Sequence, residues 1–238
     1  MTQPLGKLYL IPTDLGNNPT FDVLPVSISK VIEMIDDYIV ENDKTARHFI
    51  KKTVPSKVQS TLRLNLLNKF TEKSEMTHFL DACKKGLSVG LLSEAGCPAI
   101  ADPGADIVKL AHQNNIQVVP LVGPSSIILA LMGSGMNGQS FAFNGYLPID
   151  KDQRKSELKR LERLSFEQNQ TQIFIETPYR NNKMLEDLIA VLQPQTRVCV
   201  ACDITLPSEI IKTYTANEWK QKKVDLHKRP AIFIIHKD

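Results

Sequence analysis

The chain has 238 residues, of which 42% are hydrophobic and 23% charged, and this composition excludes an intrinsically disordered protein. Four cysteines are too few for a disulfide framework, the longest apolar run ("SIILALMGSG") is too short to cross a bilayer, and "MTQPLGKLYLIP" lacks the pattern of a secretion signal, so we expect a cytoplasmic protein without a membrane segment. The net charge of +3 lies in residues 124–238, and such a weakly basic half fits RNA as a partner, although many enzymes with neutral substrates share it.

Apolar and amphipathic stretches alternate through the first half of the chain. We expect strands at 7–12, 38–42, 87–93 and 116–122, and helices at 27–38, 44–52, 74–86, 105–115 and 124–132. The stretch "LSVGLLS" is continuously apolar, which is typical of a strand inside a parallel sheet that is covered on both faces. The order strand, loop, helix, strand that follows it predicts a mostly parallel sheet.

The second half has a different pattern. We expect strands at 139–148, 171–178, 196–205, 209–215 and 230–237, and helices at 152–164, 181–194 and 216–223. Few helices separate the closing strands, so a mixed sheet is predicted. A strand end, Gly123 and Pro124 coincide near the middle of the chain, and we place a domain boundary there. The sequence thus predicts an α/β protein with two α/β domains, 1–122 and 123–238.

Two loops follow predicted strands and lead into predicted helices, where open α/β sheets bind ligands. In "SEAGCPAIADPG", Gly96 allows close approach of a ligand and Pro98 stiffens the loop, while Asp102 and Pro103 read as a helix N-cap and first helical residue. "VGPSS" repeats the arrangement, with Gly123 before two hydroxyl residues. At adjacent strand ends these loops would face one crevice; a pair of ordinary turns is the alternative.

Two patterns that suggest cofactors stand in the wrong context. "GSGMNG" matches G-x-G-x-x-G, but it follows a helix and precedes a strand, so helix termination explains it better than dinucleotide binding. Cys199 and Cys202 form a C-x-x-C pair inside an alternating strand, and Cys83 and Cys97 are too far apart to complete a zinc site. The histidines show no metal-ligand spacing, and we expect no metal.

Two basic stretches have open interpretations. "KDQRKSELKRLER" is either a solvated helix face or a surface that contacts RNA. In "DKTARHFIKK", Lys44, Arg47, Lys51 and Lys52 fall close to one side of a helix.

The order "KLYLIPTDLGN", "SEAGCPAIADPG", "VVPLVGPSS", "FNGYLP", "IFIETPYR" resembles the tetrapyrrole methylase superfamily over nearly the whole chain. Within it, the sequence is most similar to the branch that 2′-O-methylates a cytidine of 16S ribosomal RNA. The resemblance implies two α/β domains, a homodimer, and S-adenosylmethionine bound in the cleft between the domains.

The same resemblance assigns site residues. The implied contacts of the methyl donor are Pro12, Gly96, Cys97, Pro98, Ile100, Ser125, Ser126, Ala201, Cys202 and Pro230. The implied substrate-binding residues are Asn17, Lys44, Arg47, Tyr179 and Arg180. A hydroxyl nucleophile also needs a group that accepts its proton, and Glu41, Glu94 and Glu176 are candidates because each follows a strand, although each could instead cap a helix or pair with a cation.

The sequence departs from this branch mainly on the substrate side. The segment "ENDK" stands where the branch has E-D-T-R, and only Glu41 is kept. In the segment that corresponds to S-D-A-G-T-P, Glu94 replaces the Asp and Cys97 replaces the Thr. The segment "CDITL" stands where the branch has R-E-L-T-K. The sequence is therefore that of a divergent member, with methyl transfer to ribosomal RNA ribose as the first hypothesis. Methylation of a small molecule such as a tetrapyrrole, or binding of the donor or of RNA without catalysis, are the alternatives.

Overall fold

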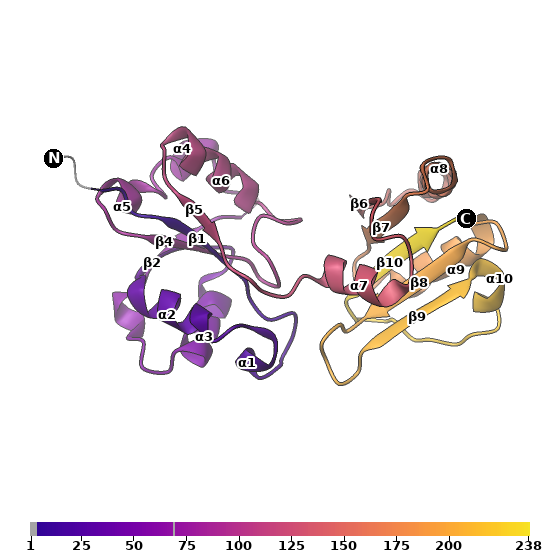
Figure 1. The fold of residues 1–238 in the computed structure, drawn as a ribbon, viewed down its shortest axis with the longest axis horizontal. Helices are drawn as coiled ribbons and strands as arrows, with labels where there is room; N and C mark the ends of the chain where they lie inside the picture. Colours follow the sequence, from indigo (N-terminus) through magenta and orange to yellow (C-terminus); the bar gives the residue numbers. More distant parts are fainter. Residues whose placement is uncertain (1–3, 69) are drawn as a thin grey trace. The chain divides into compact units, whose positions relative to one another are not determined.

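The chain folds as two compact units that divide between Ser125 and Ser126 (Figure 1). The computed structural model describes residues 4–68 and 70–238. Each unit contains one five-stranded sheet and its own hydrophobic core. The division lies slightly beyond the boundary that we expected after Val122, at the point where a loop leads into helix α7 (Ser126–Ser134).

The sheet of the first unit is parallel throughout, in the order β3-β2-β4-β1-β5. Its strands are β1 (Leu8–Ile11), β2 (Asp37–Val40), β3 (Arg63–Leu66), β4 (Val89–Leu92) and β5 (Val118–Pro120). Leu8 of β1 lies opposite Val89 of β4 and Val118 of β5. All four residues of β4 are buried, because helices cover both faces of the sheet. The predicted parallel sheet is confirmed.

The helices of the first unit lie in two layers, one on each face of the sheet (Figure 1). One layer has α1 (Thr20–Val23), α2 (Ser27–Met34) and α3 (Asp43–Thr53); the other has α4 (Lys73–Met76), α5 (Asp81–Lys84) and α6 (Gly104–Gln113). The first layer packs Ile28, Phe49 and Ile50 against the sheet, and the second packs Cys83 and Ile107. A short 3-10 helix, η1 (Gln59–Thr61), precedes β3.

Three elements of this unit differ from our expectations. The helix predicted at 27–38 ends at Met34, because Asp37 already belongs to strand β2. The helix predicted at 74–86 is two short helices, α4 and α5. Strand β3 was not predicted: "RLNL" is a partly exposed edge strand, and it is held by pairing with β2 and by the Arg63–Asp37 ion pair, with Arg63 Nη2 2.5 Å from Asp37 Oδ2.

The second unit has a mixed sheet in the order β6-β7-β10-β8-β9, in which only β6 and β7 are parallel. Its strands are β6 (Phe141–Tyr146), β7 (Thr171–Ile175), β8 (Arg197–Cys202), β9 (Ile210–Thr215) and β10 (Ala231–His236). Helices α8 (Lys151–Gln168), α9 (Asn181–Val191) and α10 (Ala216–Trp219) pack on one face through Leu161, Leu188 and Trp219. The predicted mixed sheet is confirmed.

The two cofactor-like patterns are structural elements of the second unit. Helix α7 ends within "GSGMNG", where Gly135 has a φ of +68°, a conformation that suits a helix end. Cys199 and Cys202 are buried in β8 as free thiols. In the described part of the chain, no group of three His, Cys, Asp or Glu side chains could hold a metal ion. Of the described helices, none is both long and apolar enough to span a bilayer.

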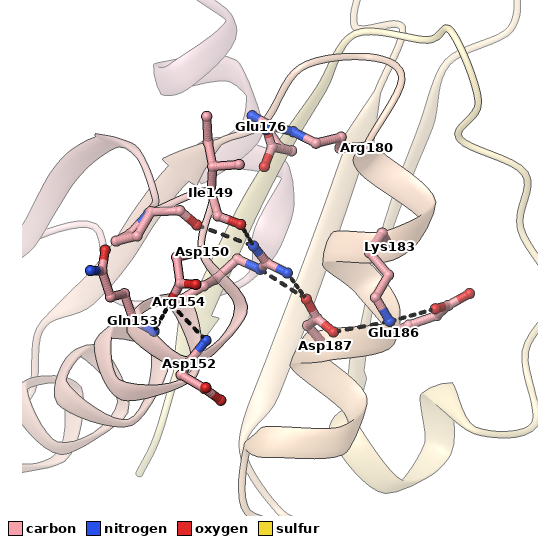
Figure 2. Close-up of polar contacts among 11 residues, drawn as sticks. Ile149, Asp150, Asp152, Gln153, Arg154, Glu176, Arg180, Lys183, Glu186 and Asp187 are labelled. Carbon is pink, nitrogen blue, oxygen red and sulfur yellow. Dashed lines mark hydrogen bonds and ion pairs between the residues drawn. The ribbon is translucent and has the colours of Figure 1, made fainter.

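One basic residue of "KDQRKSELKRLER" is buried and has a structural role. Arg154 donates from Nε and Nη2 to Oδ2 of Asp187 at 2.8 and 2.6 Å, and from Nη1 to the carbonyl of Ile149 at 2.6 Å (Figure 2). Lys183 reaches the other oxygen of Asp187 at 3.2 Å. Arg154 thus joins α8 to α9 and to the loop after β6. By contrast, Arg160 on the same helix is exposed.

Arg154→Ala should lower the free energy of unfolding by about 3 kcal/mol, because it leaves the carboxylate of Asp187 buried with only Lys183 to compensate it. Denaturant unfolding of the purified protein measures this difference. Arg160→Ala is the matched control, since it removes an arginine that pairs with Glu157 at the surface of the same helix and should cost less than about 1 kcal/mol. Equal losses in the two variants would contradict the structural role of Arg154.

Candidate active site

Three loops at the carboxyl ends of strands β1, β4 and β5 pack against one another. The amide of Thr13 and the hydroxyl of Ser93 both donate to the carbonyl of Gly96, at 3.0 and 3.1 Å. The thiol of Cys97 lies 3.3 Å from the carbonyl of Pro124. We expected the loops after β4 and β5 to follow adjacent strands. Strand β1 lies between β4 and β5, yet the two loops still touch through Cys97 and Pro124, and the loop after β1 packs against both.

Two glycines make this close packing possible. A Cβ atom at Gly123 would lie 2.2 Å from Cγ of Pro12, so any side chain there would push the loops after β1 and β5 apart. Gly96 has a φ of +79°, and a Cβ atom there would approach Leu15 to 3.1 Å and the carbonyl of Pro124 to 3.3 Å. Both glycines therefore allow the three loops to pack at a distance that a side chain would prevent.

The loop from Ser93 to Gly104 is held in an unusual backbone conformation. Ala99 and Ala101 have φ values of +66° and +62°, a backbone conformation that costs energy for any residue with a side chain. Oδ1 of Asp102 accepts hydrogen bonds from the amides of Ala99 and Gly104 at 2.8 and 2.9 Å and stabilises the turn. Our assignment of the helix start was one residue early: Pro103 is the cap residue, and α6 begins at Gly104.

A pocket of about 590 Å³ lies in the first unit beside these loops. It is bounded by the loop after β1, the end of β2, one side of α3 and the start of the loop after β4. Polar and charged side chains from all four segments line it. They are Thr13, Asp14, Asn17, Glu41, Lys44, Thr45, His48, Lys52, Ser93 and Glu94.

Glu41 and Glu94 lie together at one end of the pocket. The amide of Glu94 donates to Oε1 of Glu41 at 3.2 Å, and the hydroxyl of Thr45 donates to Oε1 of Glu94 at 2.6 Å. Burial raises the pKa of Glu41, and the negative charges of Asp102 and Glu94 raise it further, while the hydrogen bond from the Glu94 amide opposes them. Burial also raises the pKa of Asp102. A carboxylate with a raised pKa in a pocket is suited to accept a proton.

Helix α3 presents one stripe of side chains to the pocket. Its N-cap residue, Asn42, accepts hydrogen bonds from the amides of Lys44 and Thr45, so the helix begins directly after Glu41. Lys44, His48 and Lys52 line the pocket at a spacing of four residues, which places them on one face of the helix.

Arg47, which we predicted to bind substrate together with Lys44, does not line this pocket. Its Nε atom lies 2.8 Å from Oδ1 of Asp43, and its Nη1 atom donates to the carbonyl of Gln59 at 2.7 Å. Lys44 and Arg47 share one prediction because spacings of three and four residues both approximate one side of a helix. Thr45 and His48 were not predicted, although the four-residue spacing from Lys44 could have indicated His48.

The candidate residues after β7 belong to the second unit. Glu176 is buried, and its Oε1 accepts hydrogen bonds from the amide of Thr177 and from Nη2 of Arg180, both at 2.6 Å. Glu176 and Arg180 are labelled in Figure 2. Tyr179 is 71% exposed, its ring centroid 6.0 Å from that of His227. Glu176 is thus compensated by an arginine, as the ion-pair alternative anticipated.

Three further donor-contact candidates lie close together in the second unit. Cys202, at the end of β8, is paired with Ala231 of β10, and the amide of Asp203 donates to the carbonyl of Pro230 at 3.0 Å. Ala201 and Cys202 are fully buried in the second unit. Of the remaining candidates, Pro12 and Pro98 are buried, Ile100 is exposed, and Ser125 and Ser126 are half-buried at the start of α7.

Comparison with known proteins identifies the family. Residues 26–219 match the Tetrapyrrole (Corrin/Porphyrin) Methylases. Ribosomal RNA small subunit methyltransferase I of Vibrio cholerae is 30% identical over 240 residues, which cover 99% of this chain and 79% of that protein. The chain therefore belongs to the tetrapyrrole methylase family, and it is a methyltransferase.

Solved structures share the fold. The methyltransferase CobJ superposes with a TM-score of 0.64 at 15% identity, over 98% of this chain and 94% of that one. Uroporphyrin-III C-methyl transferase from Thermus thermophilus, complexed with S-adenyl homocysteine, gives 0.56 at 14% identity and 98% coverage of both chains. The two α/β sheets thus form the architecture of known tetrapyrrole methyltransferases.

The raised pKa of Glu41 predicts a pH-dependent gain in stability for Glu41→Gln. Between the pKa of an unfolded glutamate, about 4.3, and the raised folded value, the folded state binds more protons, so the free energy of unfolding falls as the pH rises through this window. Glutamine carries no charge and keeps an oxygen for the Glu94 amide. Thermal unfolding should therefore show the variant about 1–3 °C more stable at pH 7, with a smaller difference at pH 4. A lower midpoint than wild type at pH 7 would contradict this account.

Proposed function

We propose that this protein transfers a methyl group from S-adenosylmethionine to a ribose hydroxyl of ribosomal RNA. The observation that carries the proposal is the position of Glu41, a half-buried carboxylate with a raised pKa in a pocket next to the loop after β4. The family membership supports methyl transfer, and the name of the Vibrio cholerae relative, which matches almost the whole chain, supports ribosomal RNA as the substrate.

We assign S-adenosylmethionine to the loops after β1, β4 and β5 and to the β8 and β10 residues named above. Support comes from the position of these loops at the carboxyl ends of neighbouring parallel strands, where open α/β sheets bind ligands, and from the S-adenyl homocysteine complex of a protein with this fold. The donor would supply an electrophilic methyl group on a sulfonium. In this assignment the chain contributes Pro12, Gly96, Cys97, Pro98, Ile100, Ser125, Ser126, Ala201, Cys202 and Pro230.

Methyl transfer is an in-line displacement in which a bond forms from the ribose oxygen to the methyl carbon as the bond from that carbon to sulfur breaks. The ribose hydroxyl must lose its proton, and we assign Glu41 as the acceptor. The other two candidates are less available: Oε1 of Glu94 is bound by Thr45, and Glu176 is paired with Arg180. The main contribution of the protein would be to hold the hydroxyl in line with the methyl group.

The proposed substrate-binding residues are Asn17, Lys44, Tyr179 and Arg180. Asn17 and Lys44 line the pocket, and Tyr179 and Arg180 follow β7, with the exposed ring of Tyr179 available to stack on a base. Arg47 is proposed only as a residue that stabilises α3. We also propose that the protein acts as a homodimer in the cytoplasm.

The donor assignment predicts different effects for neighbouring residues of one loop. Gly96→Val should abolish binding of S-adenosylmethionine, because a branched side chain at a φ of +79° would displace Leu15 and the Pro124 carbonyl. Cys97→Ser should keep the affinity within about threefold, since the thiol makes only weak hydrogen bonds to carbonyls of the protein. Calorimetric titration measures both. The thermal unfolding of Gly96→Ala, which adds a smaller side chain, shows whether substitution at this position prevents folding. Equal losses of donor affinity in Gly96→Val and Cys97→Ser would overturn the assignment.

The substrate assignment predicts donor-dependent methylation of small ribosomal subunits from a strain that lacks the modification. Labelled methyl groups should appear in the RNA with the wild-type protein, and Glu41→Gln should lower kcat by about 100-fold or more while donor affinity is unchanged. Donor binding without any methyl group in ribosomal RNA would exclude this substrate and favour a small molecule or an inactive protein. An unchanged kcat in Glu41→Gln would exclude Glu41 as the proton acceptor.

A further inference from the structure

We propose that Lys44 and His48 form a subsite for a phosphodiester group of the RNA, next to the ribose whose hydroxyl faces Glu41. The inference rests on the proposed function and deepens it, since it states which part of the nucleotide each side of the pocket recognises.

Both side chains line the pocket from one face of α3, and both are exposed. Within residues 4–68 and 70–238, neither the Lys44 ammonium nor the His48 ring has a hydrogen-bond or ion-pair partner. A lysine offers three donors, and a histidine ring offers at least one in either tautomer. The pocket therefore contains two neighbouring donor groups that nothing in the described chain satisfies.

The other basic residues of α3 all form hydrogen bonds or ion pairs with protein atoms. Lys52, the third member of the stripe, lies 2.7 Å from Oδ2 of Asp14 and donates to the carbonyl of Asn18. Lys51 donates to the carbonyl of Pro55, and Arg47 is bound as described above. Lys44 and His48 are thus the two donor residues of α3 that line the pocket without a partner among the described residues, and this position favours a ligand.

The polar groups of the pocket are complementary to the ribose hydroxyl and the phosphate of one nucleotide. Lys52 compensates Asp14, which leaves the carboxylates of Glu41 and Glu94 at the strand ends and the donors of Lys44 and His48 on α3. A ribose has its 2′-hydroxyl next to a phosphodiester on the neighbouring carbon, so a hydroxyl that meets a carboxylate and a phosphate that meets hydrogen-bond donors can belong to one nucleotide. Asn42 already accepts from the first amides of α3, so the phosphate would be held by side chains and not by the helix end.

The test compares Lys44→Gln and His48→Gln with Lys30→Gln in methylation of unmethylated small ribosomal subunits at several salt concentrations. Lys30 is an exposed lysine of α2 outside the pocket, so its substitution removes one charge from the same unit. Each pocket variant should raise KM for the subunits about tenfold with kcat within about threefold of wild type. Lys44→Gln should also lower the slope of log KM against log salt by about one.

Lys30→Gln should resemble wild type in KM and in salt dependence, and titration with S-adenosylmethionine should give equal donor affinity for all four proteins. If the wild-type protein methylates the subunits but the pocket variants behave as Lys30→Gln does, the phosphate subsite is wrong while the proposed function stands. If wild type transfers no methyl group to the subunits, the proposed function fails first. A loss in kcat without a change in KM would assign Lys44 and His48 to positioning of Glu41 and would also overturn the subsite.

Discussion

The close packing of three loops at the carboxyl ends of β1, β4 and β5 is the constraint on which the rest of the site depends. Gly123 lies against the ring of Pro12 with no room for a Cβ atom, and the carbonyl of Gly96 accepts hydrogen bonds from both Thr13 and Ser93. Because these contacts hold the loop after β4 in place, Glu94 reaches Glu41 on one side and Thr45 on the other. One wall of the pocket is thus positioned by backbone contacts.

Two departures from the related RNA branch meet at this point. "ENDK" ends at Lys44, directly before Thr45, and Glu94 stands where that branch commonly has an aspartate. In the structure the hydroxyl of Thr45 donates to Oε1 of Glu94 at 2.6 Å. Thr45 directly follows the altered segment, so the residue that binds the Glu94 side chain adjoins the other departure.

Carboxylates of the second unit are paired with arginines, whereas in the described chain the carboxylate of Glu41 in the pocket is not. Arg154 and Asp187, and likewise Arg180 and Glu176, satisfy each other at short distance, as buried ions in a stable fold usually do. Among the described residues Glu41 accepts a hydrogen bond from one amide, that of Glu94, while burial and the charges of Asp102 and Glu94 raise its pKa. The protein thus tolerates an electrostatic cost at Glu41, which is typical of a site where reactivity and stability oppose each other.

The two α/β sheets, their parallel and mixed character, and the family could all be predicted from the amino-acid sequence. Hydrophobic periodicity and the order of the motifs are local properties, so they could be read without coordinates, and they also indicated the buried strand before "SEAGCPAIADPG". Strand β3 escaped prediction because it is a partly exposed edge strand that is held by β2 and Arg63. Only the tertiary structure decided that Lys44 and His48 face the pocket while Arg47 does not, and that Glu41 has a raised pKa while Glu176 is paired. These properties depend on which groups surround a side chain in space, and residues as distant in sequence as Glu41, Glu94 and Asp102 supply them.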